Sequence, residues 1–322
     1  MKTSYKIFLL AVEERNLTKA AQKAHVSQQC ISAHIKKLEE IFGVKLLIRK
    51  PRFHLTAAGE MLERSLRQVQ NIERVLDINI QEIKNESKGK VVLGISPSRA
   101  QILLPDFIIR YNSFFPNVEI ECVTADTAFC EKLLIEGKID AFLGVNPTTN
   151  PLFEIIPLAK ETLYFIATDV YLEQYYSGNF KKDKKLFSEG IDLRFFQTGP
   201  YVLNSESSPL WEIIKRHTDN LRIKLLIPYR VSTHGPQIEI CGKGLAAAFC
   251  PLMILKSVEQ YNKMPSSSKK INVFPLKYLD EGLRLDIVLY KNPYQTRYFN
   301  KFIELLSQEC QKTLTSSQAI IN

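Results

Sequence analysis

Near the start of the chain, apolar residues recur at helical spacing in three runs. The run over 5–12 predicts a first helix. Asn16 stands where an N-cap is expected, before a short alanine-rich helix over 17–24. Ser27 is the expected N-cap of a longer third helix, which ends at Gly43. The pattern therefore predicts three helices, with a tight turn between the second and the third.

The third helix is amphipathic. Its apolar stripe is formed by Ile31, Ile35, Leu38 and the pair Ile41/Phe42. Its polar face carries Gln28, Gln29, Ser32, His34, Lys36 and Lys37. Side-chain amides pair with adenine edges in the major groove, and lysines bind phosphates. A solvated helix face is the alternative, but a short helix, a turn and a polar-faced helix together are typical of a helix-turn-helix.

A small β-hairpin is predicted next. Residues 44–49 and 53–55 read as two short strands on either side of a basic turn, and the tip holds Arg49, Lys50 and Arg52. A basic hairpin, or wing, next to a helix-turn-helix is suited to contact phosphates or the minor groove. Such contacts make the affinity for DNA depend strongly on salt.

The wing is followed by a long predicted helix, with Thr56 as its N-cap and Glu60 in its first turn. A heptad seam, interrupted at Glu73, is formed by Leu62, Leu66, Val69, Leu76, Ile80 and Ile83. Pairing of two copies is favoured over packing of this helix on its own domain, because the sequence offers it no globular partner nearby. A two-fold dimer presents two reading helices, so the expected target is an interrupted inverted repeat in double-stranded DNA.

From residue 91 the pattern changes to alternating strands and helices. Strands are predicted over 91–95, 118–123 and 139–145, with helices over 102–111 and 127–136. This order implies right-handed crossovers and a parallel sheet, whose ligands bind outside the carboxyl ends of the strands.

A second lobe is predicted from residue 163 onward. Its expected elements are a strand over 163–167, a strand over 201–203, a helix around Trp211, a strand over 223–231, a helix over 237–242 and a strand over 245–250. The lysine run 181–185 is interpreted as a solvated loop. The chain then returns to the first lobe through 266–270, with a strand over 285–290 and a final helix over 298–310.

Composition changes this picture in one respect, the distribution of charge. With 45% hydrophobic and 24% charged residues, the 322-residue chain is expected to be globular, with about two domains. Residues 1–90 hold 17 Lys and Arg against 10 Asp and Glu, whereas residues 91–322 hold 26 against 24. The formal charge of +9 is thus concentrated in the first quarter, for which a polyanion is the natural partner.

Signals for export, membranes, metals and catalysis were not found in the sequence. The apolar run over 7–12 is too short for a signal peptide, and no stretch has the length of a spanning helix, so we expect a cytoplasmic protein with no membrane partner. The six cysteines include no C-x-x-C pair and are interpreted as buried thiols. We expect no metal, no cofactor and no catalytic residues: Gly94–Ser98 lacks the second glycine of G-x-S-x-G, and no phosphate-binding loop follows a strand.

The opening residues resemble a known family. Phe8, Ala20-Ala21, Val26-Ser27-Gln28, Ser32, Ile35-Lys36-Lys37-Leu38-Glu39, Gly43-Val44-Lys45-Leu46-Leu47, Arg49 and Leu55-Thr56-Ala57-Ala58-Gly59 are similar to the winged helix-turn-helix of LysR-type transcriptional regulators. The sequence departs from that pattern at Gln29-Cys30, His34 and Leu47-Ile48, which bear on operator preference. The candidate DNA-binding residues are Thr18, Ser27, Gln28, Gln29, Ser32, His34, Lys36, Lys37, Arg49 and Arg52.

The resemblance continues through Gly89–Ile95, Leu104-Pro105, Phe115–Val118, Gly137–Asp140 and Gly242–Pro251. It implies an α/β effector-binding domain in which a small molecule lies between two Rossmann-like lobes similar to those of periplasmic binding proteins. Carried over by position, the effector-binding residues are Ser96, Ser98, Arg99, Thr127, Leu203, Asn204, Ser232 and Thr233. Hydroxyls and N–H groups at helix N-termini favour an anion, and Arg99 adds a charge, so a carboxylate or an amino acid is expected. For Ser96, Ser98, Ser232 and Thr233, helix capping is an equal alternative. Ala246 stands where the family has glycine.

The domains expected are the DNA-binding domain over 1–60, the linker helix and hinge over 57–88, the effector-binding domain over 89–312 and a tail over 313–322. Within the effector-binding domain, lobe I comprises 90–162 and 270–312, and lobe II comprises 163–269. The leading hypothesis is an effector-gated transcriptional regulator that forms a homodimer or homotetramer, with RNA polymerase as a further candidate partner. Two alternatives are a bifunctional enzyme with a winged-helix repressor module and a cysteine-based oxidant switch; the resemblance places the reactive pair of such switches over 204–211, where this chain has no cysteine.

Overall fold

The computed structural model describes residues 1–48, 53–84, 88–178, 180–265, 269–291 and 295–321. The chain divides into two compact units, one that contains residues 1–88 and one that contains most of residues 89–322. Each unit is described by itself.

The first unit begins with the three helices that the sequence predicts: α1 (Thr3–Glu14), α2 (Leu17–Lys23) and α3 (Gln28–Phe42). Asn16 caps α2 by accepting hydrogen bonds from the backbone N–H groups of Thr18 and Lys19. The three helices bury a common core, which includes Phe8, Ala20, Ile31 and Ile35. The apolar stripe of α3 is therefore buried as predicted, except that Ile41 and Phe42 are exposed.

The wing and the long helix complete this unit. Strands β1 (Leu47–Ile48) and β2 (His54–Leu55) pair antiparallel, with Leu47 opposite Leu55. Helix α4 (Ala57–Lys84) follows, and the Thr56 hydroxyl accepts a hydrogen bond from the Gly59 N–H, which confirms Thr56 as its cap. Leu66 of α4 packs into the helical core, so the first part of α4 is fixed to the first unit.

Lobe I of the second unit is built on a five-stranded sheet with the order β4-β3-β5-β12-β6. The strands are β3 (Gly89–Ile95), β4 (Val118–Thr124), β5 (Ala141–Val145), β6 (Phe153–Glu161) and β12 (Leu283–Tyr290). Strand β3 pairs parallel with β4 and β5, as predicted, whereas β12 pairs antiparallel with β5 and β6. The sheet is mixed because β12 returns from lobe II instead of following a crossover helix.

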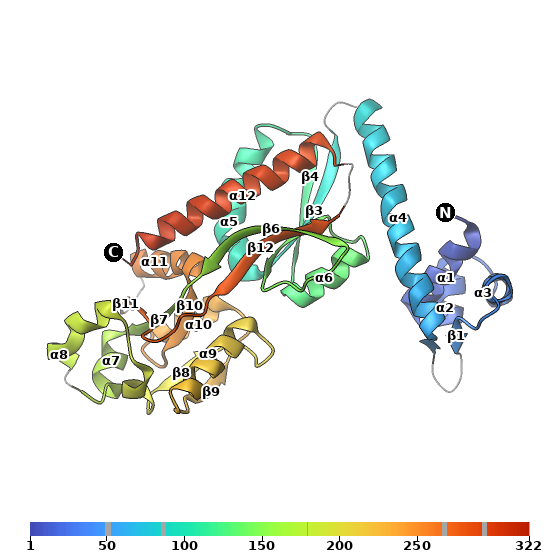
Figure 1. Ribbon diagram of the computed structural model, residues 1–322. Helices are drawn as coiled ribbons and strands as arrows, with labels where there is room; N and C mark the ends of the chain where they lie inside the picture. Colours follow the sequence, from blue (N-terminus) through green and yellow to red (C-terminus); the bar gives the residue numbers. More distant parts are fainter. Residues whose placement is uncertain (49–52, 85–87, 179, 266–268, 292–294, 322) are drawn as a thin grey trace. The chain divides into compact units, whose positions relative to one another are not determined.

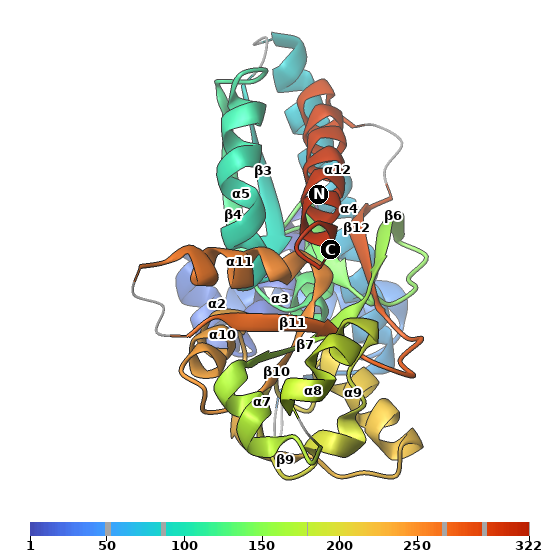
Figure 2. The ribbon, with the colours of Figure 1, turned by 90° about the vertical axis from the view of Figure 1, so that its left-hand side faces the viewer.

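Lobe I also contains the helices α5 (Pro97–Asn112), α6 (Thr127–Ile135) and α12 (Arg297–Gln318). Helices α5 and α12 lie side by side (Figure 2). Phe107 and Tyr111 of α5 meet Phe302 of α12 edge to face, and the Tyr111 hydroxyl donates to the Tyr298 carbonyl oxygen at 3.0 Å. This aromatic seam fixes α5, whose N-cap and first turn carry the predicted effector residues Ser96, Ser98 and Arg99.

Lobe II contains a three-stranded sheet with the order β10-β7-β11 and a parallel pair, β8 and β9. The strands are β7 (Leu163–Thr168), β8 (Pro200–Leu203), β9 (Leu226–Arg230), β10 (Ala248–Pro251) and β11 (Ile271–Pro275). Its helices are α7 (Asp169–Tyr175), α8 (Phe180–Asp183), α9 (Pro209–Asn220), α10 (His234–Gly242) and α11 (Leu255–Lys263), with 3-10 turns η1 (Lys184–Glu189), η2 (Leu193–Phe196) and η3 (Leu252–Ile254). Figure 1 shows β6 and β12 running from the sheet of lobe I toward this lobe.

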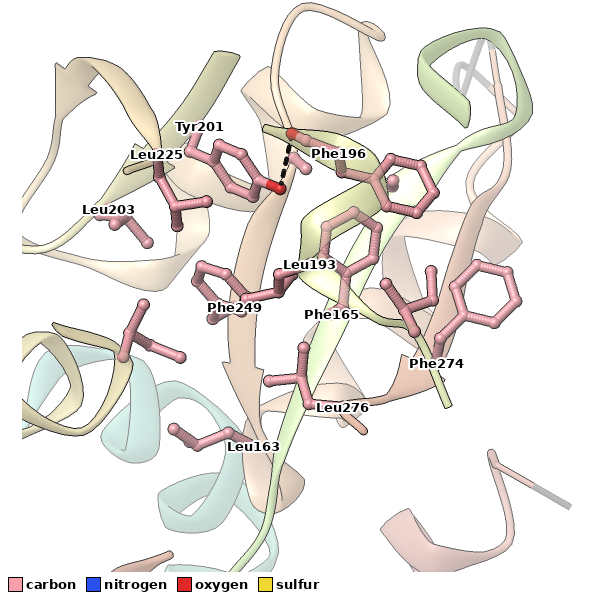
Figure 3. Close-up of a cluster of buried hydrophobic side chains, with 14 of the residues drawn as sticks. Leu163, Phe165, Leu193, Phe196, Tyr201, Leu203, Leu225, Phe249, Phe274 and Leu276 are labelled. Carbon is pink, nitrogen blue, oxygen red and sulfur yellow. Dashed lines mark hydrogen bonds between the residues drawn. The ribbon is translucent and has the colours of Figure 1, made fainter. Parts of the chain in front are cut away.

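The core of lobe II is rich in aromatic rings (Figure 3). Phe165 packs against Phe196 and Phe249, and the Tyr201 hydroxyl donates to the Phe196 carbonyl oxygen at 3.2 Å. Burial raises the pKa of Tyr201. Leu203, at the end of β8, belongs to the same core.

Three expectations about this unit are wrong. The lysine run 181–185 lies in α8 and η1, because Phe180 and Phe187 are buried on either side of it and bring the backbone onto the core. Strand β11 pairs with β7, with Ile271 opposite Thr168, so lobe II extends past residue 270. The final helix continues through Gln318, with Leu314 buried, so most of 313–322 is helix and not a tail.

Candidate functional site

Helix α3 presents the predicted reading face. The Ser27 hydroxyl caps α3 by accepting from the Cys30 N–H at 3.1 Å, and the next two residues, Gln28 and Gln29, are exposed in the first turn. Gly43 ends the helix with a φ of +67°, a left-handed conformation that glycine adopts without strain. The amide side chains therefore stand at the N-terminal end of an anchored helix, where recognition helices contact bases.

The other polar residues of α3 differ in their contacts. Lys36 and Lys37 are exposed, and Nζ of Lys36 lies 3.6 Å from Oε1 of Glu40, one helical turn later. Ser32 is half-buried. His34 is half-buried as well, and its Nδ1 forms a 2.9 Å hydrogen bond with the Ser4 hydroxyl of α1. His34 thus anchors α3 to α1 with one ring nitrogen, a role that the sequence alone did not indicate.

The remaining predicted DNA-binding residues lie on α2 and on the wing. Thr18 is exposed near the start of α2. Arg49 and Arg52, predicted at the tip of the wing, lie outside the described residues.

A buried carboxylate, Glu39, joins α3 to the wing. Its Oε1 accepts from the backbone N–H groups of Leu46 and Leu47 at 3.0 and 3.4 Å, and its Oε2 accepts from Lys45 Nζ at 2.8 Å. Burial opposes the charge of Glu39, but the hydrogen bonds from Lys45 and the two amides outweigh it and lower the pKa. Sequence reasoning missed this role, although the glutamate belongs to the motif that carries the family resemblance.

The base of the wing is also fixed to α4. Thr56 donates its hydroxyl to the Lys45 carbonyl oxygen at 2.6 Å, and its N–H donates to Leu46 O at 3.1 Å. At Gly59 a Cβ would lie 2.1 Å from the Leu46 carbonyl oxygen, so only glycine permits this approach. The reading helix, the wing and the long helix therefore meet at Lys45–Leu47.

Helix α4 exposes an apolar stripe beyond the core of the first unit. Met61, Val69, Ile72, Leu76 and Ile80 are between 42% and 65% exposed. A run of large apolar side chains in water is unfavourable and marks an interaction surface. The predicted seam is thus exposed at Val69, Leu76 and Ile80, while Leu66 packs into the unit's own core.

Three predicted effector residues of lobe I, Ser96, Ser98 and Arg99, lie at the start of α5, and the fourth, Thr127, is the first residue of α6. Ser96 is the N-cap, but its hydroxyl makes no capping hydrogen bond. The Ser98 hydroxyl accepts from the His234 N–H at 3.2 Å, which connects α5 of lobe I to α10 of lobe II. Thr127 accepts from the Val145 N–H at 2.9 Å, so its hydroxyl holds β5.

Arg99 does not supply an uncompensated charge. Its side chain is 5% exposed, and its Nη2 donates to Oε2 of Glu161, a side chain that is fully buried at the end of β6. Glu161 Oε1 accepts from the Met253 N–H at 2.9 Å. The expectation that Arg99 adds a positive charge is therefore wrong, because the charge is neutralised by a residue that the sequence did not single out.

In lobe II the predicted residues divide into two groups. The side chain of Leu203 is fully buried in the aromatic core. Asn204 donates from Nδ2 to the Ser232 carbonyl oxygen at 3.2 Å, and its Oδ1 accepts from Gln237 Nε2 at 3.1 Å. Ser232 is exposed, and Thr233 is the N-cap of α10 without a side-chain hydrogen bond.

Two further residues of α10 belong to this site. Gln237 is 1% exposed and bonds both Asn204 and the Val231 carbonyl oxygen. Burial and the nearby charge of Arg99 lower the pKa of His234 to about 4, while Gln237 acts in the opposite direction. The imidazole is therefore neutral near pH 7. The helix N-terminus was visible in the sequence, but the direction of these side chains was not.

Comparison with known proteins identifies the family. Residues 3–60 match the family model for the bacterial regulatory helix-turn-helix protein of the lysR family, and residues 84–311 match the LysR substrate binding domain. The chain belongs to the LysR family. Hca operon transcriptional activator HcaR of Escherichia coli is 31% identical over 161 residues, which are 49% of this chain and 54% of HcaR. The matched part thus spans about half the length of the curated relatives.

Solved structures of LysR-family proteins share the fold over nearly the whole chain. A full-length OxyR variant from Pseudomonas aeruginosa has a TM-score of 0.65 and 19% identity, with 97% of this chain and 95% of that chain covered. Full-length CbnR in complex with its target DNA has a TM-score of 0.59 and 18% identity, with 96% and 100% covered. These likenesses confirm the fold, a winged helix-turn-helix followed by two α/β lobes.

The cysteines of this LysR-family chain are dispersed. Cys130, Cys241, Cys250 and Cys310 are buried, and Cys30 and Cys122 are half-buried. Burial raises the pKa of Cys130 and of Cys310 to about 12, which disfavours the reactive thiolate. Among the described residues, no group of His, Cys, Asp or Glu is arranged to hold a metal ion. In the same part of the chain, no helix combines the length and apolar composition needed to cross a membrane.

Proposed function

We propose that this LysR-family chain is a sequence-specific DNA-binding transcriptional regulator, gated by a small molecule that binds between the two lobes of its second unit. The exposed polar face of α3 carries the proposal. Gln28, Gln29, Lys36 and Lys37 face solvent on a helix whose other side is buried. This face has the side chains that read base edges and bind phosphates.

Recognition of DNA is assigned to two kinds of contact. The amides of Gln28 and Gln29 contact base edges, assisted by Ser32 and His34. The phosphate backbone of the DNA is contacted by Thr18, Ser27, Lys36, Lys37, Arg49 and Arg52. Two copies pair through the exposed stripe of α4, so the target is an interrupted inverted repeat. A tetramer and a contact with RNA polymerase are further parts of this proposal.

Gating is assigned to the region where α5 and α10 meet. Ser96, Ser98, Asn204 and Thr233 surround the N-terminal ends of these helices, which favour a carboxylate. An effector that binds one arrangement of the lobes more tightly shifts the oligomer toward that arrangement and changes the spacing of the two reading helices. The chain acts in the cytoplasm by binding alone, without catalysis.

A salt titration of the full chain tests the proposal. In filter binding to duplex DNA, log K should fall linearly and steeply with log salt, because each neutralised phosphate contributes a slope of about −0.9. Absent or salt-independent binding would contradict it. Turnover of a nucleotide by the full chain would support the enzyme alternative instead.

A further inference from the structure

Two neighbouring strands connect the two lobes of the second unit. Strands β6 and β12 pair antiparallel, with Leu283 opposite Glu161 at the end that faces lobe II. Both connections between the lobes therefore run through one ribbon (Figure 1). Lobes that are joined at one place can move relative to each other through small backbone changes at that place. Any further attachment between the lobes limits this motion.

Helix α12 is long enough to reach both lobes. Its 22 residues span about 33 Å, at a rise of about 1.5 Å per residue. Near its start, Phe302 lies in the aromatic seam with α5 of lobe I. Farther along, Gln311 Nε2 donates to the Leu158 carbonyl oxygen of β6 at 2.8 Å, and the helix also contacts η3 of lobe II. Figures 1 and 2 both show the end of α12 next to α11 of lobe II.

The chain beyond residue 311 packs on lobe II. The match to the LysR substrate binding domain ends at residue 311, so residues 312–321 lie outside it. Leu314 is buried in the last turns of α12. Ile320 and Ile321 follow the helix and pack against a second hydrophobic core of lobe II. That core includes Tyr164 of β7, Ile238 of α10 and Val258 of α11.

The contact with lobe II has a defined backbone conformation and a polar component. The N–H of Ile320 donates to the Ser317 carbonyl oxygen at 3.1 Å, and the N–H of Ile321 donates to the Gln318 carbonyl oxygen at 3.3 Å. Burial raises the pKa of the Tyr164 hydroxyl, and side-chain hydrogen bonds with Gln318 and Thr162 act in the opposite direction. Apolar and polar contacts therefore meet at the same strand of lobe II.

We propose that residues 312–321 form a strap that ties lobe II to lobe I and restrains the separation of the lobes. The first turns of α12 anchor the strap on lobe I, and Ile320 and Ile321 attach it to lobe II. Separation of the lobes must pull these two side chains away from the core of lobe II, and exposure of apolar surface to water is unfavourable. The strap needs no ligand and no DNA, so it goes beyond the proposed function.

The amide of His234 reports the separation of the lobes. Its N–H donates from α10 of lobe II to the Ser98 hydroxyl of lobe I at 3.2 Å, so it exchanges with deuterium when the lobes part. Strand β3 lies inside the sheet of lobe I, between β4 and β5, and its amides exchange only when that sheet opens. Comparison of the two rates separates movement of the lobes from loss of overall stability.

Hydrogen–deuterium exchange of the full chain tests the strap. Ile320→Ser combined with Ile321→Ser leaves α12 in place and removes the apolar contact with lobe II. Exchange at His234 should become at least about 10-fold faster, because two half-buried isoleucines no longer hold the lobes together, while exchange in β3 should stay the same. Ala319→Ser, at the exposed position next to Ile320, is the control and should change neither rate.

Three results would overturn the proposal. Unchanged exchange at His234 in the double variant would show that residues 312–321 do not restrain the lobes. Acceleration of His234 and β3 by the same factor would show that these residues contribute only to overall stability. A double variant that fails to fold, as judged by circular dichroism, would lead to the same conclusion, because a strap is not needed for the lobes to fold.

Discussion

Gln28 and Lys37 illustrate how two exposed side chains of one helix take different roles. Gln28 lies in the first turn of α3, where we propose that it contacts base edges, and Lys37 is an exposed cation with no ion pair to any residue that the structure describes. Their substitution by alanine should therefore affect DNA binding in two separable ways.

We expect Gln28→Ala to reduce discrimination at one base position by about 1 to 3 kcal/mol. Lys37→Ala should weaken binding to all duplexes evenly and flatten the slope of log K against log salt by about one unit. Competition binding with a set of duplexes, repeated across salt, measures both quantities. Identical effects of the two substitutions would contradict the assigned roles.

Glu39 predicts a pH dependence of stability. Since the hydrogen bonds from Lys45 and two amides lower its pKa in the folded chain, the ionised form contributes stability above the unfolded pKa of about 4.5, and this contribution is lost as the pH falls through the lowered folded value. We expect Glu39→Gln to be less stable by about 1 to 2 kcal/mol near neutral pH, where only the wild type pairs with Lys45.

Thermal unfolding of both proteins between neutral pH and about pH 3 measures this difference. The advantage of the wild type should be full above about pH 5 and should shrink in acid. A difference that is constant with pH would show that the charge of Glu39 contributes nothing.

At the scale of single residues, the features that could be predicted depend on neighbours in the sequence. Asn16, Ser27, Thr56 and Gly43 act where the sequence places them, because capping depends on a few neighbouring residues. Arg99 could not be predicted in the same way. Its partner Glu161 is 62 positions away and is brought to it only by the fold.

At the scale of elements, helix α4 has one face packed and one face exposed. Leu66 lies in the core of the first unit, whereas Leu76 and Ile80 are 56% and 45% exposed. If two copies pair through α4 as proposed, Leu76→Lys combined with Ile80→Lys should convert the dimer to a monomer, because the substitutions would bury two charges in each copy's side of the paired seam.

Sedimentation velocity of the full chain measures this change, with circular dichroism to confirm that the monomer remains folded. Gln70→Lys, an exposed polar position outside the stripe, is the control and should leave the dimer intact. A doubly substituted protein that remains dimeric would show that α4 is not the main interface.

Elements with strong periodicity were predicted well. The helices of the first unit, α4, and the strands β3, β4 and β5 follow the sequence pattern closely. The pairing of β11 with β7 and the antiparallel insertion of β12 were not predictable, since both strands are fully formed only by contacts with distant parts of the chain. The lysine run 181–185 was wrongly predicted as a loop because its charge suggested exposure to solvent. Two flanking aromatic residues, Phe180 and Phe187, are buried in the core and hold this segment in place.

At the scale of the whole molecule, the distribution of charge follows the division of the chain into two units. The basic first quarter contains α3 with its exposed polar face, and the nearly neutral remainder contains the two lobes. The family could be inferred from the motif around α3, but the contacts around the proposed effector site required the structure, because they join residues of β6, α5 and α10. Their convergence leaves no periodic signal in the sequence.

Selection of duplexes from a pool with a randomised segment tests the central claim most directly. The full chain should enrich an inverted repeat with one fixed half-site spacing, and Gln28→Ala should lose preference at one position in each half-site. Enrichment of no sequence, or of a single half-site without a symmetric partner, would contradict the account of a dimeric reader of DNA.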